Sequence, residues 1–201
     1  MKKLIFYILL IFFTLHANAQ VKENLKIPKN PKIGLSLSGG GAKGFAHVGV
    51  LKVLDSLGVK VDYISGTSMG AIVGGLYASG YTGKDIEKII LDTDFYNLIF
   101  NQNNRAESSF FNKSVDKYLL KVPIKNGKAT LPSSISSGQK NLYLLKELFK
   151  NVSNINDFSK LPIPFMCVAT NLETGKIKIF ENGDLSESIL ASSAFPSLMD
   201  P

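Results

Sequence analysis

The sequence predicts an α/β fold, in which a mainly parallel central sheet carries helices on both faces. Between residues 32 and 91, short apolar strand-like runs alternate with helix-like runs in a β-α-β-α order, which favours parallel strands joined by helical crossovers. The 201 residues are 45% hydrophobic, enough for one substantial core. The single cysteine, Cys167, lies in an apolar run and has no partner for an internal disulfide, so the fold must rest on that core.

Apolar spacing and punctuating glycines place the elements in order. Residues 32–38 form the first strand, in which Ile33, Leu35 and Leu37 alternate toward the core, and residues 45–57 form the first helix. Thr82 and Asp85 are placed as the N-terminal cap pair of a later helix. The full prediction continues with a strand at 61–65, helices at 71–78 and 82–91, a hairpin around Asn126-Gly127, a helix at 141–150, a strand at 164–170 and a helix at 186–194.

The N-terminus has the form of a secretory signal peptide, at residues 1–19. Lys2 and Lys3 precede a largely apolar run at 4–15, and Ala17-Asn18-Ala19 fits a cleavage site. A membrane-spanning helix needs about 20 apolar residues, so this run is too short for an anchor. We expect export through the Sec pathway, to the periplasm, the outer membrane or the medium. A linker at 20–31 then leads into one folded domain at 32–201.

The charge balance is modestly basic. Removing the signal peptide removes two lysines and no acid, which lowers the formal net charge from +7 to +5. This excess is compatible with approach to an anionic membrane surface without being specific for one. Nucleic acid is disfavoured as a partner, because the lysines are scattered and the protein is expected to leave the cytoplasm.

The run Gly66-Thr67-Ser68-Met69-Gly70 has the G-x-S-x-G pattern and lies between a strand-like and a helix-like segment. This context is typical of a nucleophile elbow, a sharp turn that exposes a serine hydroxyl at the end of a sheet. Only glycine at positions 66 and 70 lets the chain pass so closely. Ser68 is therefore the predicted catalytic nucleophile, placed at a helix N-terminus that favours a developing oxyanion.

A second glycine-rich loop, Gly39-Gly40-Gly41-Ala42-Lys43-Gly44, follows a strand and opens a helix. Its backbone N–H groups could bind a phosphate or form the oxyanion hole of an acyl-transfer enzyme. A P-loop needs Gly-Lys-Ser/Thr, which does not occur in this loop. A dinucleotide-binding site expects an acid at the end of the second strand, and none stands there. We assign the oxyanion hole to residues 39–41 together with Met69, with Lys43 and Gly44 supporting the loop.

The proton acceptor for Ser68 is less obvious than the nucleophile. His47 is the one histidine outside the signal peptide, and it lies on the apolar face of the first helix, where a structural role is expected. A Ser-His-Asp triad is therefore disfavoured, and a Ser–carboxylate dyad is expected. No cofactor and no metal is implied, because no His, Asp or Cys cluster has ligand spacing.

These motifs resemble those of the patatin-like phospholipases, in particular the exported bacterial type. The resemblance rests on the glycine loop continued to His47, on residues 62–71 around Ser68, on residues 161–165, and on the A-S-x-x-x-P turn at 191–196. It implies a three-layer α/β fold and hydrolysis of phospholipids or other lipid esters by a Ser–Asp dyad. In the family that aspartate follows the Ser/Pro turn in an Asp-Gly-Gly or Asp-Gly-Ala motif.

This sequence departs from the family pattern at the aspartate. Asp62, Asp184 and Asp200 do not fit the motif, and none is assigned as the base. We expect the dyad aspartate beyond residue 201, which makes the hydrolase domain C-terminally incomplete. Two alternatives stay open: a non-catalytic module that binds lipid or protein, and, more weakly, a nucleotide-binding domain that uses the glycine loop.

An aromatic-rich patch lies in the least regular part of the chain. It could form an acyl-chain wall or a membrane-contacting lid, or it could be ordinary core under a long loop. Its members are Phe95, Tyr96, Leu98, Ile99, Phe100, Phe110 and Phe111.

Overall fold

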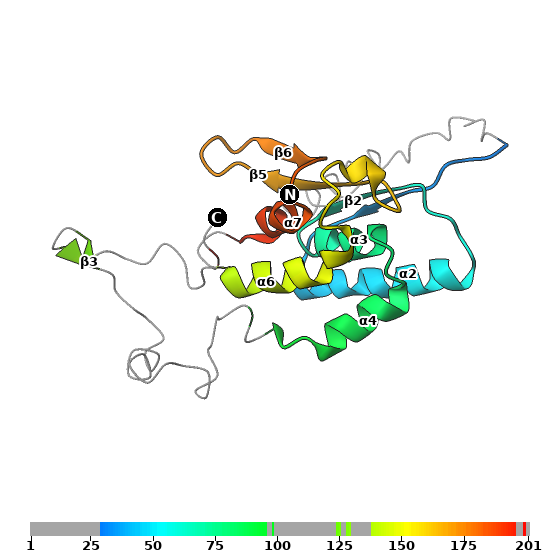
Figure 1. Cartoon of the computed structure of the whole chain (residues 1–201), viewed down its shortest axis with the longest axis horizontal. Helices are drawn as coiled ribbons and strands as arrows, with labels where there is room; N and C mark the ends of the chain where they lie inside the picture. Colours follow the sequence, from blue (N-terminus) through cyan, green and yellow to red (C-terminus); the bar gives the residue numbers. More distant parts are fainter. Residues whose placement is uncertain are drawn as a thin grey trace, which may run out of the picture. The chain divides into compact units, whose positions relative to one another are not determined.

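A computed structural model describes residues 29–95, 98, 124–125, 128–129, 138–195 and 199. The chain divides into two units, Met1–Pro31 and Lys32–Pro201, and the fold described below belongs to the second. Its elements are shown in Figure 1. In chain order they are β1 (Gly34–Leu37), the 3₁₀ helix η1 (Gly41–Phe45), α2 (Ala46–Ser56), β2 (Tyr63–Thr67), α3 (Met69–Ala78), α4 (Gly83–Asp92), β3 (Ile124–Lys125), β4 (Lys128–Ala129), α6 (Gln139–Leu148), the 3₁₀ helices η2 (Lys150–Val152) and η3 (Phe158–Lys160), β5 (Phe165–Thr170), β6 (Ile177–Phe180) and α7 (Leu185–Ser193).

The central sheet has four strands in the order β1-β2-β5-β6. The first three run parallel, with Leu37 opposite Gly66 and Gly66 opposite Cys167, and β6 pairs antiparallel with β5. The predicted α/β class with a mainly parallel sheet is thus confirmed. β3 and β4 pair antiparallel as a two-stranded hairpin, as predicted. The Asn126-Gly127 turn between them lies outside the described residues.

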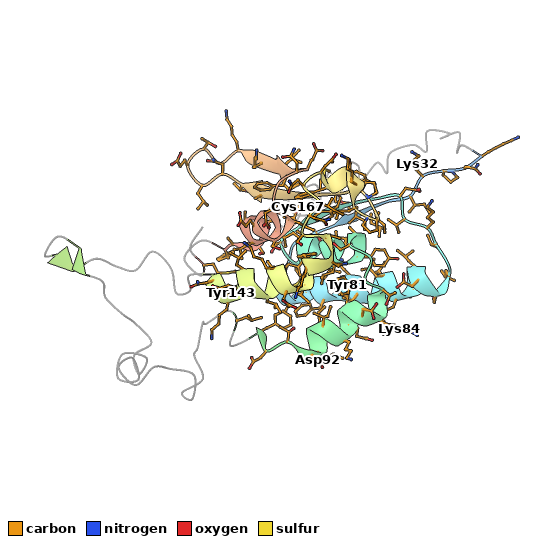
Figure 2. All side chains as sticks on the ribbon, viewed as in Figure 1. Lys32, Tyr81, Lys84, Asp92, Tyr143 and Cys167 are labelled. Carbon is orange, nitrogen blue, oxygen red and sulfur yellow. The ribbon has the colours of Figure 1, made fainter. Side chains whose placement is uncertain are left out.

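The core lies where α3 and α7 pack against the sheet, as seen below the strands in Figure 1. Ile64 and Phe165 of neighbouring strands are almost fully buried there. α3 crosses α7 at close range, because a Cβ added at Gly75 would lie 2.5 Å from Cδ1 of Ile189. Cys167 lies inside the sheet region (Figure 2), where burial raises the pKa of its thiol to about 12 and keeps it protonated.

Around the candidate site, the structure differs from the sequence prediction in three details. Ile33 precedes β1 and is 37% exposed, because the strand begins only at Gly34. β2 lies two residues later than the predicted strand at 61–65, at Tyr63–Thr67, and α3 begins at Met69 and not at residue 71, so Ser68 alone connects strand and helix. Finally, the glycine loop closes into η1, which leads directly into α2.

Among the described residues, no helix combines the length and the apolar character needed to cross a membrane.

Asp55, near the end of α2, ties three helices together. Its carboxylate accepts hydrogen bonds from the Tyr77 hydroxyl of α3, at 2.5 Å, and from the Gly83 N–H that opens α4, at 2.7 Å. Burial, followed by the hydrogen bond to Asp55, raises the pKa of Tyr77 to about 12. An unfolded tyrosine titrates near pH 10. The stabilisation from this hydroxyl is therefore complete below about pH 10 and is lost as the pH rises through about 12.

Replacing Tyr77 with phenylalanine should lower the free energy of unfolding by about 1.5 kcal/mol at neutral pH, because a hydrogen bond to a charged group is lost. Urea unfolding at a series of pH values measures this effect. The difference from the wild type should shrink as the pH rises from 10 to 12. Tyr143→Phe is the matched control, since this tyrosine is 65% exposed on α6 (Figure 2). Equal stability of the Tyr77→Phe protein and the wild type at pH 7 would contradict the assignment.

Candidate active site

Ser68 occupies the single position between β2 and α3. Its backbone has φ 54° and ψ −120°, and among the described residues it is the one non-glycine residue with a positive φ. Such a conformation costs about 1–3 kcal/mol and persists only where the surrounding structure enforces it. The turn leaves Ser68 partly exposed at the carboxyl end of β2. This is the geometry of a nucleophile elbow.

Gly66 and Gly70 allow the elbow to form. A Cβ added at Gly66 would lie 2.5 Å from the carbonyl oxygen of Gly70. A Cβ added at Gly70 would overlap the carbonyl oxygen of Leu37, at the end of β1. The first turn of α3 therefore packs backbone to backbone against β1 and β2, and a side chain at either position would push it away.

The predicted glycine loop lies directly beside the elbow. A Cβ added at Gly39 would lie 3.1 Å from the Cβ of Ser68, and one added at Gly44 would lie 2.6 Å from the Cβ of Met69. The structure thus brings two segments that are separate in the sequence into contact around Ser68. Lys43, the charged residue of the loop, has an exposed side chain, and its N–H donates to the carbonyl oxygen of Gly40 at 3.2 Å.

Two helices, η1 and α3, begin beside Ser68. Gly40 and Gly41 have φ values of 155° and 53°, which turn the loop from β1 into η1. Met69 is the first residue of α3. The first N–H groups of a helix have no intrahelical acceptor and carry a partial positive charge. Such donors beside a serine hydroxyl can stabilise the oxyanion of an acyl-transfer reaction.

His47 does not pair with Ser68. Its Nε2 donates to the carbonyl oxygen of Ser38 at 2.9 Å, which fastens the start of α2 to the residue preceding the glycine loop. This hydrogen bond fits the structural role predicted for His47. The glycine loop that it fastens lies beside the elbow.

The carboxylates considered from the sequence have structural partners as well. Asp62 Oδ2 accepts from the N–H of Ile33 at 2.9 Å, and Asp184 caps α7 by accepting from the N–H of Glu187 at 3.0 Å. Asp200 lies outside the described residues. Within the described ranges, no carboxylate hydrogen-bonds the Ser68 hydroxyl. Nor do three His, Cys, Asp or Glu side chains gather there as metal ligands.

Sequence reasoning missed the role of Ser192. The N–H of Ser68 donates to Oγ of Ser192 at 2.9 Å, and that hydroxyl donates in turn to the carbonyl oxygen of Val168 at 2.6 Å. Ser192 is the serine of the A-S-x-x-x-P motif at 191–196, and that motif alone does not indicate what the hydroxyl contacts. Its contact with Ser68 crosses 124 positions of sequence, and no local pattern indicates it.

Of the predicted aromatic patch, the structure describes the side chains of Phe95 and Leu98. The ring of Phe95 packs against that of Phe45, the residue that follows the glycine loop, with centroids 5.0 Å apart. Tyr96, Ile99, Phe100, Phe110 and Phe111 lie outside the residues whose side chains are described.

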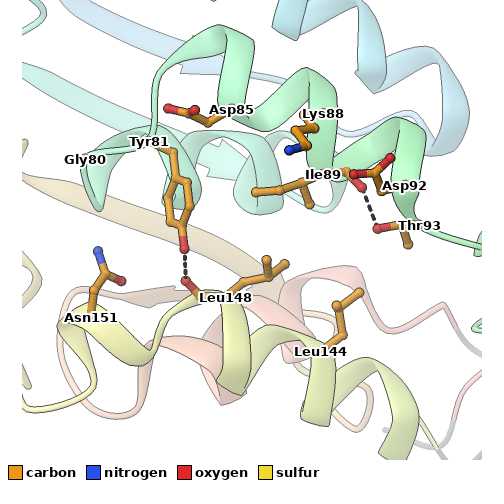
Figure 3. A pocket seen from close by; sticks show the side chains of 10 residues that line it. All are labelled: Gly80, Tyr81, Asp85, Lys88, Ile89, Asp92, Thr93, Leu144, Leu148 and Asn151. Atoms are coloured by element: carbon orange, nitrogen blue, oxygen red, sulfur yellow. Dashed lines mark hydrogen bonds between the residues drawn. The ribbon is translucent and has the colours of Figure 1, made fainter.

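A cavity of about 660 Å³ lies between α4 and α6. Figure 3 shows its lining, in which the Tyr81 hydroxyl donates to the carbonyl oxygen of Leu148 at 2.7 Å. Its lining includes neither the elbow nor the glycine loop, so it is distinct from the candidate site.

A comparison with protein families identifies the chain. The patatin-like phospholipase model matches residues 35–201, which include the glycine loop, the elbow and the turn with Ser192. The chain belongs to the patatin-like phospholipase family. The membership inferred from its motif blocks is thereby confirmed.

Curated proteins support the same family. An uncharacterized NTE family protein of Mycobacterium tuberculosis is 30% identical over 172 residues, which cover 86% of this patatin-like chain and 40% of that protein. Lysophospholipase NTE1 of Debaryomyces hansenii is 32% identical over 176 residues, which cover 88% of this chain and 10% of that protein. The chain therefore spans 40% or less of the length of these relatives.

Two solved structures share the fold of this patatin-like chain. VipD from Legionella pneumophila has a TM-score of 0.51 at 18% identity, and covers 85% of this chain with 43% of its own length. The type III effector ExoU, of Pseudomonas aeruginosa, has a TM-score of 0.50 at 21% identity, and covers 84% of this chain with 41% of its own length. At these identities the likeness concerns the fold alone.

Proposed function

We propose that this protein is a lipid acyl hydrolase that cleaves carboxylic ester bonds of phospholipids or lysophospholipids, with Ser68 as the nucleophile. The observation that carries the proposal is the strained backbone of Ser68, held between β2 and α3 and beside the glycine loop. Family membership and the lysophospholipase named among the relatives support a lipid ester as the substrate.

In the proposed mechanism, Oγ of Ser68 attacks the acyl carbonyl carbon of the lipid. The N–H groups of Gly40, Gly41 and Met69 would stabilise the oxyanion of the tetrahedral intermediate, and each such donor is worth about 2.7–4 kcal/mol. Collapse of the intermediate expels the alcohol of the lipid and leaves an acyl-enzyme. Water then attacks this ester, releases the fatty acid and restores the serine.

The proton of Ser68 needs an acceptor in the first step and returns to the leaving alcohol. We propose an aspartate beyond residue 201 for this role, in the Asp-Gly-Gly or Asp-Gly-Ala motif that the family resemblance implies. In support, His47, Asp62 and Asp184 all have structural partners. A carboxylate can accept the proton directly, as in other Ser–carboxylate arrangements.

We also propose that the hydrolase domain, from residue 32 onward, works outside the cytoplasm. The form of residues 1–19 as a signal peptide and of 20–31 as a linker supports export. The net positive charge would favour contact with anionic membranes, where the lipid substrate resides.

The test uses the protein expressed with its natural downstream residues. Vesicles of phosphatidylcholine and micelles of lysophosphatidylcholine are incubated with it, and the released fatty acids are measured by mass spectrometry. We expect fatty acid from at least one of the two lipids and none with Ser68→Ala. Vesicle binding without any release by the folded wild type would overturn the proposal and favour a non-catalytic lipid-binding module.

A further inference from the structure

We propose that Ser192 is a positioning residue for the nucleophile, because its hydroxyl completes the hydrogen-bond ladder between β2 and β5 where Ser68 leaves the sheet. The inference rests on the proposed function of Ser68 and names a residue that holds its backbone. It follows from the register of the two strands and from two hydrogen bonds.

The register gives the acceptor that the N–H of Ser68 would have in an unbroken ladder. Ile64 lies opposite Phe165, and its N–H donates to the carbonyl oxygen of Pro164 at 2.9 Å. In a parallel pair this pattern repeats every second residue along both strands. Two repeats further on, the N–H of Ser68 would donate to the carbonyl oxygen of Val168.

The hydroxyl of Ser192 stands between that donor and that acceptor. It accepts from the N–H of Ser68 at 2.9 Å and donates to the carbonyl oxygen of Val168 at 2.6 Å. A hydroxyl can do both at once, whereas a methyl group can do neither. Ser192 therefore replaces one direct ladder bond with two bonds in series, at the point where the strands part.

This bridge fixes the direction of the Ser68 N–H and thereby supports the positive φ of the elbow. The φ of Ser68 sets where its side chain lies relative to the sheet, and φ together with the ψ of −120° sets the direction of the Met69 N–H. The bridge also engages the N–H of Ser68 itself, so the oxyanion donors must come from Met69 and the glycine loop. Ser192 lies in the last turn of α7, whose Ile189 packs on α3, so its position is well supported.

Ser193 provides a matched control. It is the next residue on α7, is also partly buried, and its hydroxyl donates locally to the carbonyl oxygen of Leu190 at 3.1 Å. Ser193→Ala removes a hydroxyl from the same helix turn without touching the elbow. Ser192→Thr keeps the bridging hydroxyl and serves as the rescue variant.

The experiment compares these variants in the protein with its natural downstream residues. With a soluble ester substrate, Ser192→Ala should lower kcat roughly tenfold to a hundredfold with little change in KM, because a misaligned nucleophile slows the chemical step. Labelling of Ser68 by a fluorophosphonate should slow by a similar factor. Ser192→Thr should recover most of the rate, and Ser193→Ala should behave as the wild type.

A second readout does not depend on activity. Hydrogen–deuterium exchange of peptides that cover Ser68 should be faster in Ser192→Ala than in the wild type, and should be unchanged in Ser193→Ala. Wild-type kcat in Ser192→Ala, or a Thr variant that is folded yet as slow as the Ala variant, would overturn the proposal. Absence of Ser68-dependent activity in the wild type defeats the proposed hydrolase function instead, and in that case the exchange measurement alone decides whether Ser192 holds the elbow.

Discussion

Replacing Ser68 with alanine should abolish labelling by a fluorophosphonate probe and lower ester hydrolysis by on the order of 10⁴-fold or more, because the attacking oxygen is removed. The protein should remain folded, since the Ser68 N–H that bonds Ser192 belongs to the backbone and is retained. Gel fluorescence after probe treatment, together with fatty-acid release from lysophosphatidylcholine, measures the effect.

Two variants control this experiment. Ser65→Ala removes another serine hydroxyl from β2 and should label as the wild type does. His47→Asn removes the imidazole that bonds Ser38, and it should keep measurable labelling, because His47 supports the loop and does not contact Ser68. If His47→Asn were as inactive as Ser68→Ala while folded, the expectation that His47 is dispensable for the attack by Ser68 would be wrong.

Replacing Gly70 with alanine should destabilise the domain severely, by about 3–5 kcal/mol, and should sharply lower the yield of folded protein. The added Cβ would overlap the Leu37 carbonyl oxygen and would lie 2.6 Å from that of Ser38. Both obstacles are backbone atoms of β1 and its continuation, and they cannot rotate away as a side chain can. Urea unfolding of the soluble fraction, or the loss of that fraction, measures the effect.

Gly49→Ala is the matched control. Gly49 lies in α2, is exposed, and a Cβ added there would meet no atom within 4 Å. The same substitution should therefore stabilise the protein by about 0.5–1 kcal/mol, since alanine is the better helix former. Equal effects at both positions would show that the close approach of α3 to β1 is not what requires glycine at position 70.

The sequence was informative where local chemistry determines the structure. Thr82 and Asp85 form the capping box that their spacing predicts, because both partners lie within one helical turn. The elbow and the glycine loop were likewise predictable, since glycine in these patterns has a steric reason. The exposed Ile33 shows the limit, because alternation indicates which side of a strand is apolar and leaves open where the strand begins.

The candidate site was only partly predictable, because local patterns do not indicate contacts between segments that are distant in the sequence. Residues 39–44 and Ser68 could be assigned separately from their own motifs. Their contact depends on Gly39 and Gly44 packing against Ser68 and Met69, which only the folded sheet brings together. The bond from Ser68 to Ser192 is more remote still, and the spacing of residues along the chain contains no information about it.

The separation of 124 residues between Ser68 and Ser192 also sets the order in which the site can form during synthesis. The segment that contains the nucleophile is made early, whereas the helix that holds its backbone is among the last parts of residues 32–195 to be made. Until α7 docks against β5 and α3, the Ser192 hydroxyl cannot accept from the N–H of Ser68. A partly made or still unfolded chain therefore contains the nucleophile motif without its supported geometry. A protein proposed to hydrolyse lipids would therefore reach its competent form only after α7 has docked against β5 and α3.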